Sequence, residues 1–187
     1  MNIRFNPAKV GRVSSLLTVI LVLLVATSAF GQDAANGTAT ATVQTALAVT
    51  ATNQLMFPTV FQGVATTMGK TNNDSTAEFT ITGQGSAGIN LILSLPEYLA
   101  LADGSDRMTI SFSATDANVD STVTTPATFA GSNGWIDQNP RNLPAAAVIG
   151  SAGQTNVYLG GKVTPSTYQT AGTYTGDIIL SVAYNGT

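Results

Sequence analysis

The side chains that could carry catalysis or bind a metal in this 187-residue chain are mainly its ten Asp and Glu residues. The chain has no histidine and no cysteine, so a Ser-His-Asp triad and a zinc site built on His or Cys are excluded. Two carboxylates flanking a bond would suffice for glycoside hydrolysis. The acids, however, lie mostly in turn-forming stretches such as TNNDS and SATDANVD, where carboxylates usually bond their own backbone. We find no acid on an apolar strand, the setting that shifts a carboxyl pKa, and we predict a protein that is not an enzyme.

Three local features have a ligand interpretation and a structural one. Asp103 and Asp106 in LADGSDRM could supply oxygen ligands to calcium, but the stretch lacks the rest of an EF-hand loop, and a tight turn between two strands is favoured. Trp135 could stack on a sugar or cover one end of a sandwich. Gly160-Gly161 is more typical of a β-bulge or a close strand approach than of a ligand site. We therefore expect no cofactor.

The N-terminal residues are typical of an export signal. Residues 1–15 carry Arg4, Lys9 and Arg12 without an acid, and an apolar run follows from 16 to 26. That run is shorter than the roughly 20 residues a membrane-spanning helix needs. Small residues follow it, so we predict that residues 1–31 are a secretory signal peptide, with the alternative of an uncleaved anchor. Intact-mass measurement of the exported protein should show a start near Gln32; a chain that keeps Met1 and fractionates with membranes would contradict the prediction.

The exported chain, residues 32–187, has ten acidic and four basic residues, a net charge of −6. There is no basic patch for a phosphate backbone, so nucleic acid is not an expected partner. Charged residues are only 9% of the whole chain, against about a quarter in typical proteins. Thr, Ser, Asn, Gln and Gly fill the polar positions instead, which suits a secreted β-protein or a surface that packs against copies of itself. We expect no stable membrane insertion after the signal is removed.

Period-two alternation of apolar residues predicts an all-β chain with one domain, residues 32–187. Seven or eight short strands joined by turns indicate an antiparallel β-sandwich. Pro58 makes the apolar piece 55–61 an edge strand or a bend. The expected strands are 38–52, 76–82, 88–96, 107–114, a weak one around 123–129, 156–165 and the terminal one from 178 to 184.

Three stretches, TATATVQTALAVTATNQLMFPTV, ITGQGSAGINLILSLPEYLALADGSDRMTISFSAT and VYLGGKVTPSTYQTAGTYTGDIILSVAYN, resemble the bacterial secreted domain-of-unknown-function family 4402. The resemblance covers most of residues 38–184. That family is similar in turn to spore-coat-U-like subunits of archaic chaperone–usher pili, through an alternating N-terminal strand and a GTY entry to the last strand. The resemblance implies an immunoglobulin-like sandwich that lacks one strand. It also implies a periplasmic chaperone and an outer-membrane usher as partners, and a neighbouring subunit whose N-terminal segment fills the groove. Where those pilins typically carry a cysteine pair, this chain has Leu47 and Gly83.

Residues 32–52 are the candidate donor segment for such strand addition. Their apolar face would comprise Ala39, Ala41, Val43, Leu47 and Val49. The first three side chains are small and would contribute about 3 kcal/mol on burial, at roughly 0.8 kcal/mol per CH₂. Backbone pairing would have to supply much of the rest, which favours a short or self-contained complementation.

The terminal strand is the expected recipient. Ile178, Leu180, Val182 and Tyr184 alternate, so we expect them to form one wall of the core, with the strand edge paired to the segment around 39–49 of the same chain or of the next. Residues 38–43 are the portion expected to be free for exchange. These patterns favour a secreted structural subunit of a surface filament, pilus or matrix. The alternative is a self-contained cell-surface binding module, for example for carbohydrate.

Overall fold

The computed structural model describes residues 34–122, 124–129 and 134–186. Within them the chain is all-β and sandwich-like, with antiparallel strands and no helix, as the sequence predicts. No helix in these ranges is long and apolar enough to cross a membrane. The predicted signal peptide, residues 1–31, lies outside the described residues. The strands are β1 Ala48–Asn53, β2 Thr66–Met68, β3 Ala77–Thr82, β4 Ile89–Ser94, β5 Tyr98–Leu101, β6 Arg107–Ser111, β7 Ala117–Asp120, β8 Gly134–Gln138, β9 Gln154–Leu159, β10 Gly161–Thr164, β11 Tyr174–Thr175 and β12 Ile179–Tyr184.

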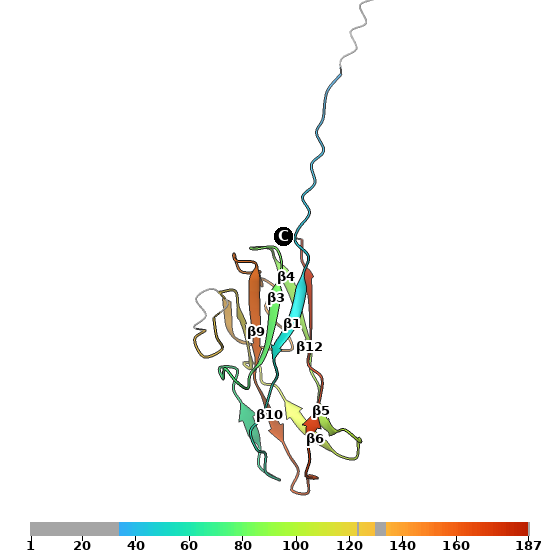
Figure 1. Ribbon diagram of the computed structural model, residues 1–187, viewed down its shortest axis with the longest axis vertical. Helices are drawn as coiled ribbons and strands as arrows, with labels where there is room; N and C mark the ends of the chain where they lie inside the picture. Colours follow the sequence, from blue (N-terminus) through green and yellow to red (C-terminus); the bar gives the residue numbers. More distant parts are fainter. Residues whose placement is uncertain (1–33, 123, 130–133, 187) are drawn as a thin grey trace, which may run out of the picture. The chain divides into compact units, whose positions relative to one another are not determined.

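The strands form three sheets. One has the order β1-β3-β9-β7-β8, a second has the order β11-β5-β6-β10-β2, and β12 pairs with β4 alone. In Figure 1, β1, β3, β9, β4 and β12 lie in the half that holds the C-terminus, and β5, β6 and β10 lie in the other half. We call the first half's outer end the near end. We call the opposite end, where the loops around residues 61–64 and 165–170 lie, the distal end.

Strict alternation of buried and exposed residues builds the core. In β4 the alternate residues Ile89, Leu91 and Leu93 are buried, and in β6 Met108 and Ile110 are. Each of these strands therefore turns one face inward, because successive side chains of a strand point to opposite faces. Phe79 and Ile81 of β3 and Val157 of β9 close the same core from the other sheet. The predicted turn in LADGSDRM is confirmed, since Gly104 N donates to Leu101 O between β5 and β6.

Three strand predictions differ from the structure. The single strand expected at 156–165 is two strands, β9 and β10, which belong to different sheets. The N-terminal strand begins at Ala48, and residues 34–47 have no regular structure, although their sequence alternates. The weak strand expected around 123–129 is absent from its described residues, where Thr125 begins a turn that buries Phe129. The strands of this region are β7 and β8 instead. Alternation fails to mark β7 because all four of its residues are buried, so neither of its faces is polar.

Gly160 is where the chain leaves one sheet and enters another, between β9 and β10. Its N donates to Asp116 O at 2.9 Å. A Cβ at this position would lie 2.6 Å from Met68 O and 2.7 Å from Lys70 N, both backbone atoms. Only glycine allows two backbone segments to approach this closely. The close strand approach expected for Gly160-Gly161 is therefore present.

Candidate functional site: a groove between two edge strands

β1 and β12 are edge strands of different sheets, and among the described residues no strand lies between them. β1 pairs with β3 on one side, and β12 pairs with β4 on one side, with Leu180 opposite Leu93 and Tyr184 opposite Ile89. The terminal strand does not pair with residues 39–49 of the same chain, which is one of the two pairings that the sequence left open; pairing with the next chain stays a prediction. β12 takes β4 because both strands present alternate apolar residues to one core, in matched register.

Two side chains of β1 on its core-facing side are open to solvent. Val49 stands opposite Ile81, which is fully buried, and Ala51 stands opposite Phe79. Yet Val49 is 39% exposed and Ala51 is exposed as well. On the other side, Ile178 and Val182 are only half-buried. The core-facing residues along both edge strands are thus only partly covered.

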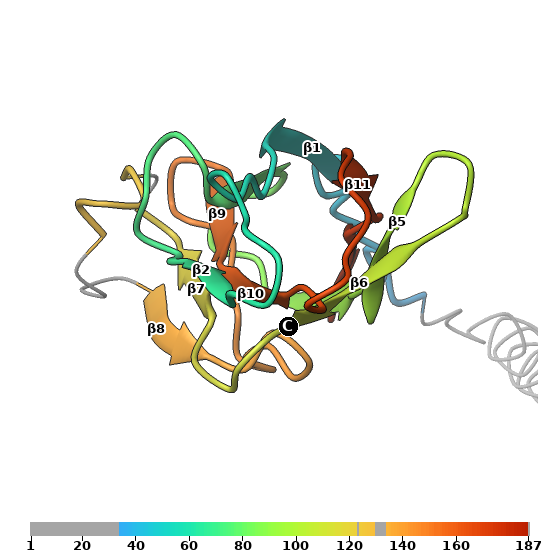
Figure 2. The same ribbon diagram turned by 90° about the horizontal axis from the view of Figure 1, so that it is seen from below.

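The open space continues toward the distal end as a groove of about 1320 Å³. Figure 2 shows the ribbon from the distal end, with β1 and β11 on one side and β6 and β10 on the other. One wall is the segment 51–62, and the other is the segment 169–178. The floor residues are Ala77, Phe79, Leu99, Met108, Ile110 and Val163.

The floor needs only small side chains to complete its cover. Phe79, Met108, Ile110 and Val163 are already buried, whereas the wall residues Leu55, Phe57 and Ile178 are only partly so. An extended strand lying in the groove would thus place its backbone between the walls and short side chains over the floor. The alternating Ala39, Ala41 and Val43 are side chains of that size.

Tyr184 fixes the start of β1 at the near end. Its hydroxyl accepts a hydrogen bond from Gln84 N at 2.7 Å and donates one to Thr45 O at 2.6 Å. Beside it, Leu47 Cδ2 lies 2.9 Å from where a Cβ on Gly83 would be. Leu47, which directly precedes β1, and Gly83, which directly follows β3, are thus neighbours. The chain is anchored from Thr45 onward, while residues 34–44 are exposed.

We expect Tyr184→Phe to loosen this anchor without disturbing the core. The change removes two hydrogen bonds at a half-buried site and should cost about 1–2 kcal/mol of unfolding free energy, at about 1 kcal/mol for each bond. Urea unfolding measures this. Tyr98→Phe, at an exposed tyrosine of β5, is the matched control and should change little. Equal stability of the two variants would contradict the anchoring role.

At the distal end, Asp106 organises the wall that leads into β11. Its Oδ2 accepts hydrogen bonds from Thr170 N, Tyr174 Oη and Gln169 Nε2, each at 2.8 Å. The bond from Thr170 N, followed by that from Tyr174, holds the pKa of Asp106 well below its usual range. Asp103 bonds the N and Oγ of Ser105, as in the expected turn. The carboxylates of the two calcium candidates, Asp103 and Asp106, thus accept hydrogen bonds from the protein itself. In the described ranges no group of three or more Asp or Glu residues could hold a metal ion.

We expect Asp106→Asn to lower the melting temperature at neutral pH by a few degrees. Because the folded pKa of Asp106 is depressed, its stabilisation is present above the ordinary value near 4 and disappears as the pH falls toward the folded value. The difference in melting temperature between the parent and the variant should thus shrink below about pH 4. Melting curves from pH 7 to pH 2 test this, and a difference that stays constant would contradict it.

A buried polar cluster on the outer face of β3, β7 and β9 contradicts the premise that no acid sits on an apolar strand where its pKa would shift. Asp120 is fully buried at the end of β7 and accepts four bonds, from N and Oγ1 of both Thr122 and Thr124. Burial acts to raise its pKa, but these bonds outweigh burial and hold the pKa below its ordinary value. Burial, followed by the charge of Asp120, raises the pKa of Glu78. Two carboxyl groups whose pKa values shift in opposite directions are typical of catalytic acid–base pairs. The hydrogen-bond partners of Glu78 and Asp120 therefore indicate whether the cluster is catalytic or structural.

The contacts of the cluster are structural. Glu78 accepts a hydrogen bond from Asn156 Nδ2 at 2.9 Å, and the hydroxyl of Tyr158 donates to Thr124 O. Phe129 packs on Tyr158 with ring centroids 6.4 Å apart. None of these residues lines the groove. The cluster holds the segment after β7 against the sheet, and its donors and acceptors are engaged with one another.

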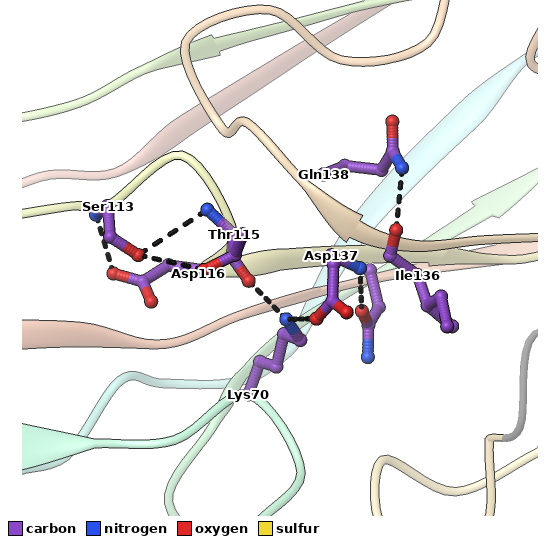
Figure 3. A network of polar contacts seen from close by, with 8 residues as sticks. Lys70, Ser113, Thr115, Asp116, Ile136, Asp137 and Gln138 are labelled. Carbon is purple, nitrogen blue, oxygen red and sulfur yellow. Dashed lines mark hydrogen bonds and ion pairs between the residues drawn. The ribbon is translucent and has the colours of Figure 1, made fainter.

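Lys70 joins the turn after β2 to two other segments. Its Nζ lies 2.5 Å from Asp137 Oδ1 and also donates to Thr115 O (Figure 3). The backbone N of Asp137 donates to Asn118 Oδ1 at 3.0 Å. Since the Asp137 side chain is 62% exposed, this ion pair contributes less than about 1 kcal/mol. Its role is to connect β2, β7 and β8.

The structure places the predicted site residues in two groups. The core-facing side of the terminal segment carries Ile178, Leu180, Val182 and Tyr184. Val49 lies in β1, and Leu47 directly precedes that strand. Ala39, Ala41 and Val43 precede β1 and are exposed. Trp135 packs partly buried against the core, as expected for a cover.

The sequence did not identify Gln62, Gln169 and the wall segment 54–61. The alternating Leu55 and Phe57 were the available sequence signal for this wall. Pro58 interrupts the alternation, so the pattern did not indicate that the wall extends to residue 61. No protein-family model, no curated protein and no solved structure matches the chain.

Proposed function

We propose that this protein is a secreted, non-enzymatic structural subunit that assembles by strand addition, with the N-terminal segment 34–44 of one copy lying in the groove of another. The observation that carries the proposal is the groove itself. Its two flanking strands are edges of different sheets, and its floor is apolar. An incoming strand would form backbone hydrogen bonds with the free edge of a wall strand, and its side chains would cover the apolar floor.

The composition of the segment supports the same function. Residues 34–44 contain no proline, so each can donate its backbone N–H to a strand partner. Val43 is 92% exposed, and the side chains that alternate with it are small. A long alternating segment without a partner is an aggregation hazard, which assembly by strand pairing would remove. If the protein is the pilin-like subunit that its sequence resembles, a periplasmic chaperone and an outer-membrane usher are its partners, and the assembly is a filament or matrix at the cell surface.

The test is deletion of residues 32–43. A variant that keeps the melting temperature of the parent but stays monomeric in sedimentation and in negative-stain images supports exchange between copies. A variant that assembles normally removes the segment from the mechanism. A variant that no longer folds indicates that each chain completes itself, which is the arrangement of a monomeric binding module.

A further inference from the structure

Three exposed apolar side chains gather at the distal end. Phe61 is 67% exposed, Val64 is 54% exposed and Tyr168 is 92% exposed. We call these three residues the distal patch. They belong to two loops that a backbone hydrogen bond connects, since Gly63 N donates to Ser166 O at 2.9 Å. Large exposed apolar side chains that cluster on a soluble domain are typical of an interaction surface.

The loops that carry the distal patch are held by several bonds. Gln62 Nε2 donates to Gln169 O at 2.6 Å, and Gln169 is itself buried and bonded to Asp106. Tyr168 N donates to Ser166 Oγ at 3.2 Å. A surface fixed in this way loses little conformational freedom when it binds a partner. The patch also adjoins the groove, since Gln62 and Gln169 are among the lining residues.

Strand addition forces two copies into direct contact. The chain is anchored to its own domain at Thr45 by Tyr184, so the inserted segment ends at Gln44 with no linker behind it. The near end of the inserting copy must therefore meet the receiving copy wherever the inserted strand leaves the groove. There are two possible exits, one at the near end and one at the distal end. β1 and β12 run in opposite directions between these ends, so the exit decides to which of the two the inserted strand is antiparallel.

Resting on the proposed function, we propose that the inserted strand leaves the groove at the distal end, where the distal patch of the receiving copy packs against the near end of the inserting copy, around Thr45, Gln84 and Tyr184. The near end of each copy presents the half-buried Tyr184 among exposed polar side chains such as Gln84, Ser86 and Ser151, so contact between two near ends would leave the distal patch uncovered. The distal end offers the apolar patch. The strand would then run antiparallel to β12, the more favourable ladder geometry.

This contact sets the form of the assembly. A near end that meets a distal end is a head-to-tail interface, which repeats into an open filament. Exit at the near end would instead bring two near ends together and allow two copies to exchange segments reciprocally as a closed pair. The distal patch thus selects between a filament and a dimer.

Disulfide trapping tests the geometry, and the chain has no cysteine of its own to interfere. We expect full-length Gln84→Cys/Tyr168→Cys to give a ladder of disulfide-linked oligomers under mild oxidation. The control Gln84→Cys/Tyr98→Cys uses a half-exposed tyrosine of β5 and should give no ladder. Dimers of Gln84→Cys alone would place two near ends together and overturn the inference, as would equal ladders from the two double variants.

A second measurement separates this inference from the proposed function. We expect Val64→Ser/Tyr168→Ser, at two patch residues that do not line the groove, to weaken assembly of the full chain at least about tenfold, as loss of interface hot-spot contacts does. A synthetic peptide of residues 34–46 carries no domain, so its binding to the groove should be the same with and without these two changes, measured in full-length chains that also carry Val43→Asp. Unchanged assembly together with intact peptide binding would overturn the role of the distal patch alone. Absence of peptide binding would overturn the proposed function and this inference with it.

Discussion

Val43→Asp is expected to abolish assembly while leaving the folded monomer as stable as the parent. Val43 is 92% exposed in the chain, so a carboxylate there is solvated and costs the monomer nothing. In a neighbour's groove the same side chain would face the apolar floor formed by Phe79, Met108 and Ile110. An unpaired buried charge costs several kcal/mol. At 1.4 kcal/mol for each factor of ten, association should fall by about a thousandfold.

The matched control is Thr42→Asp. Successive side chains of a strand point to opposite faces, so residue 42 would face solvent when residue 43 faces the floor. Sedimentation velocity gives the size distribution of each variant, and thermal unfolding checks that both remain folded. Equal assembly of Val43→Asp and the parent would mean that Val43 stays outside the groove. Equal loss in both variants would mean that net charge, rather than burial, governs association.

Gly160→Ala is expected to destabilise the fold strongly. The new Cβ would lie 2.6 Å from Met68 O and 2.7 Å from Lys70 N, and neither backbone atom belongs to a flexible side chain that could move aside. Either β2 or the link from β9 to β10 must shift. Overpacking of this kind costs about 3 kcal/mol, which corresponds to a fall in melting temperature of about 10 °C for a domain of this size.

Gly69→Ala is the control for Gly160→Ala. Its Cβ would meet only Thr71 Oγ1, at an ordinary 3.9 Å, and Gly69 lies in the same backbone crossing. We expect it to change the unfolding free energy by less than about 1 kcal/mol. Urea unfolding of the two variants gives the comparison. A Gly160→Ala variant as stable as Gly69→Ala would show that the two segments are not packed as described.

The sequence predicted those strands that have one face buried in the core and the other face exposed to solvent. β4, β6 and β12 alternate because each covers the core on one side only. β7 escaped prediction since the segment after Asp120 covers its outer face and removes the polar side of the pattern. Residues 38–47 were predicted to be a strand because alternation reports which side chains suit a strand, but a strand also needs a backbone partner.

The groove was predicted in part. The alternating face of Ile178, Leu180 and Val182 indicated one border. The floor combines Phe79, Met108 and Val163 from three strands far apart in the chain, so it depends on a strand order that local patterns do not contain. Asp120 was missed for the same reason: its burial follows from β7 lying between β8 and β9. The local sequence signal was the pair Thr122 and Thr124 directly after Asp120, because both threonines can donate hydrogen bonds to its carboxylate.

The central claim, that a segment of one copy fills the groove of another, is tested most directly by disulfide trapping between different molecules. One population carries Val43→Cys, and another carries a single cysteine in a groove wall, at Thr59, Thr173 or Thr175 in turn; all three positions are exposed and line the groove. After mixing and mild oxidation, we predict a disulfide between the cysteine introduced at position 43 of one chain and at least one wall position of the other, found by peptide mapping. No such link at any wall position, with an intrachain link in a double-cysteine variant that stays monomeric, would contradict the claim and show that each chain fills its own groove.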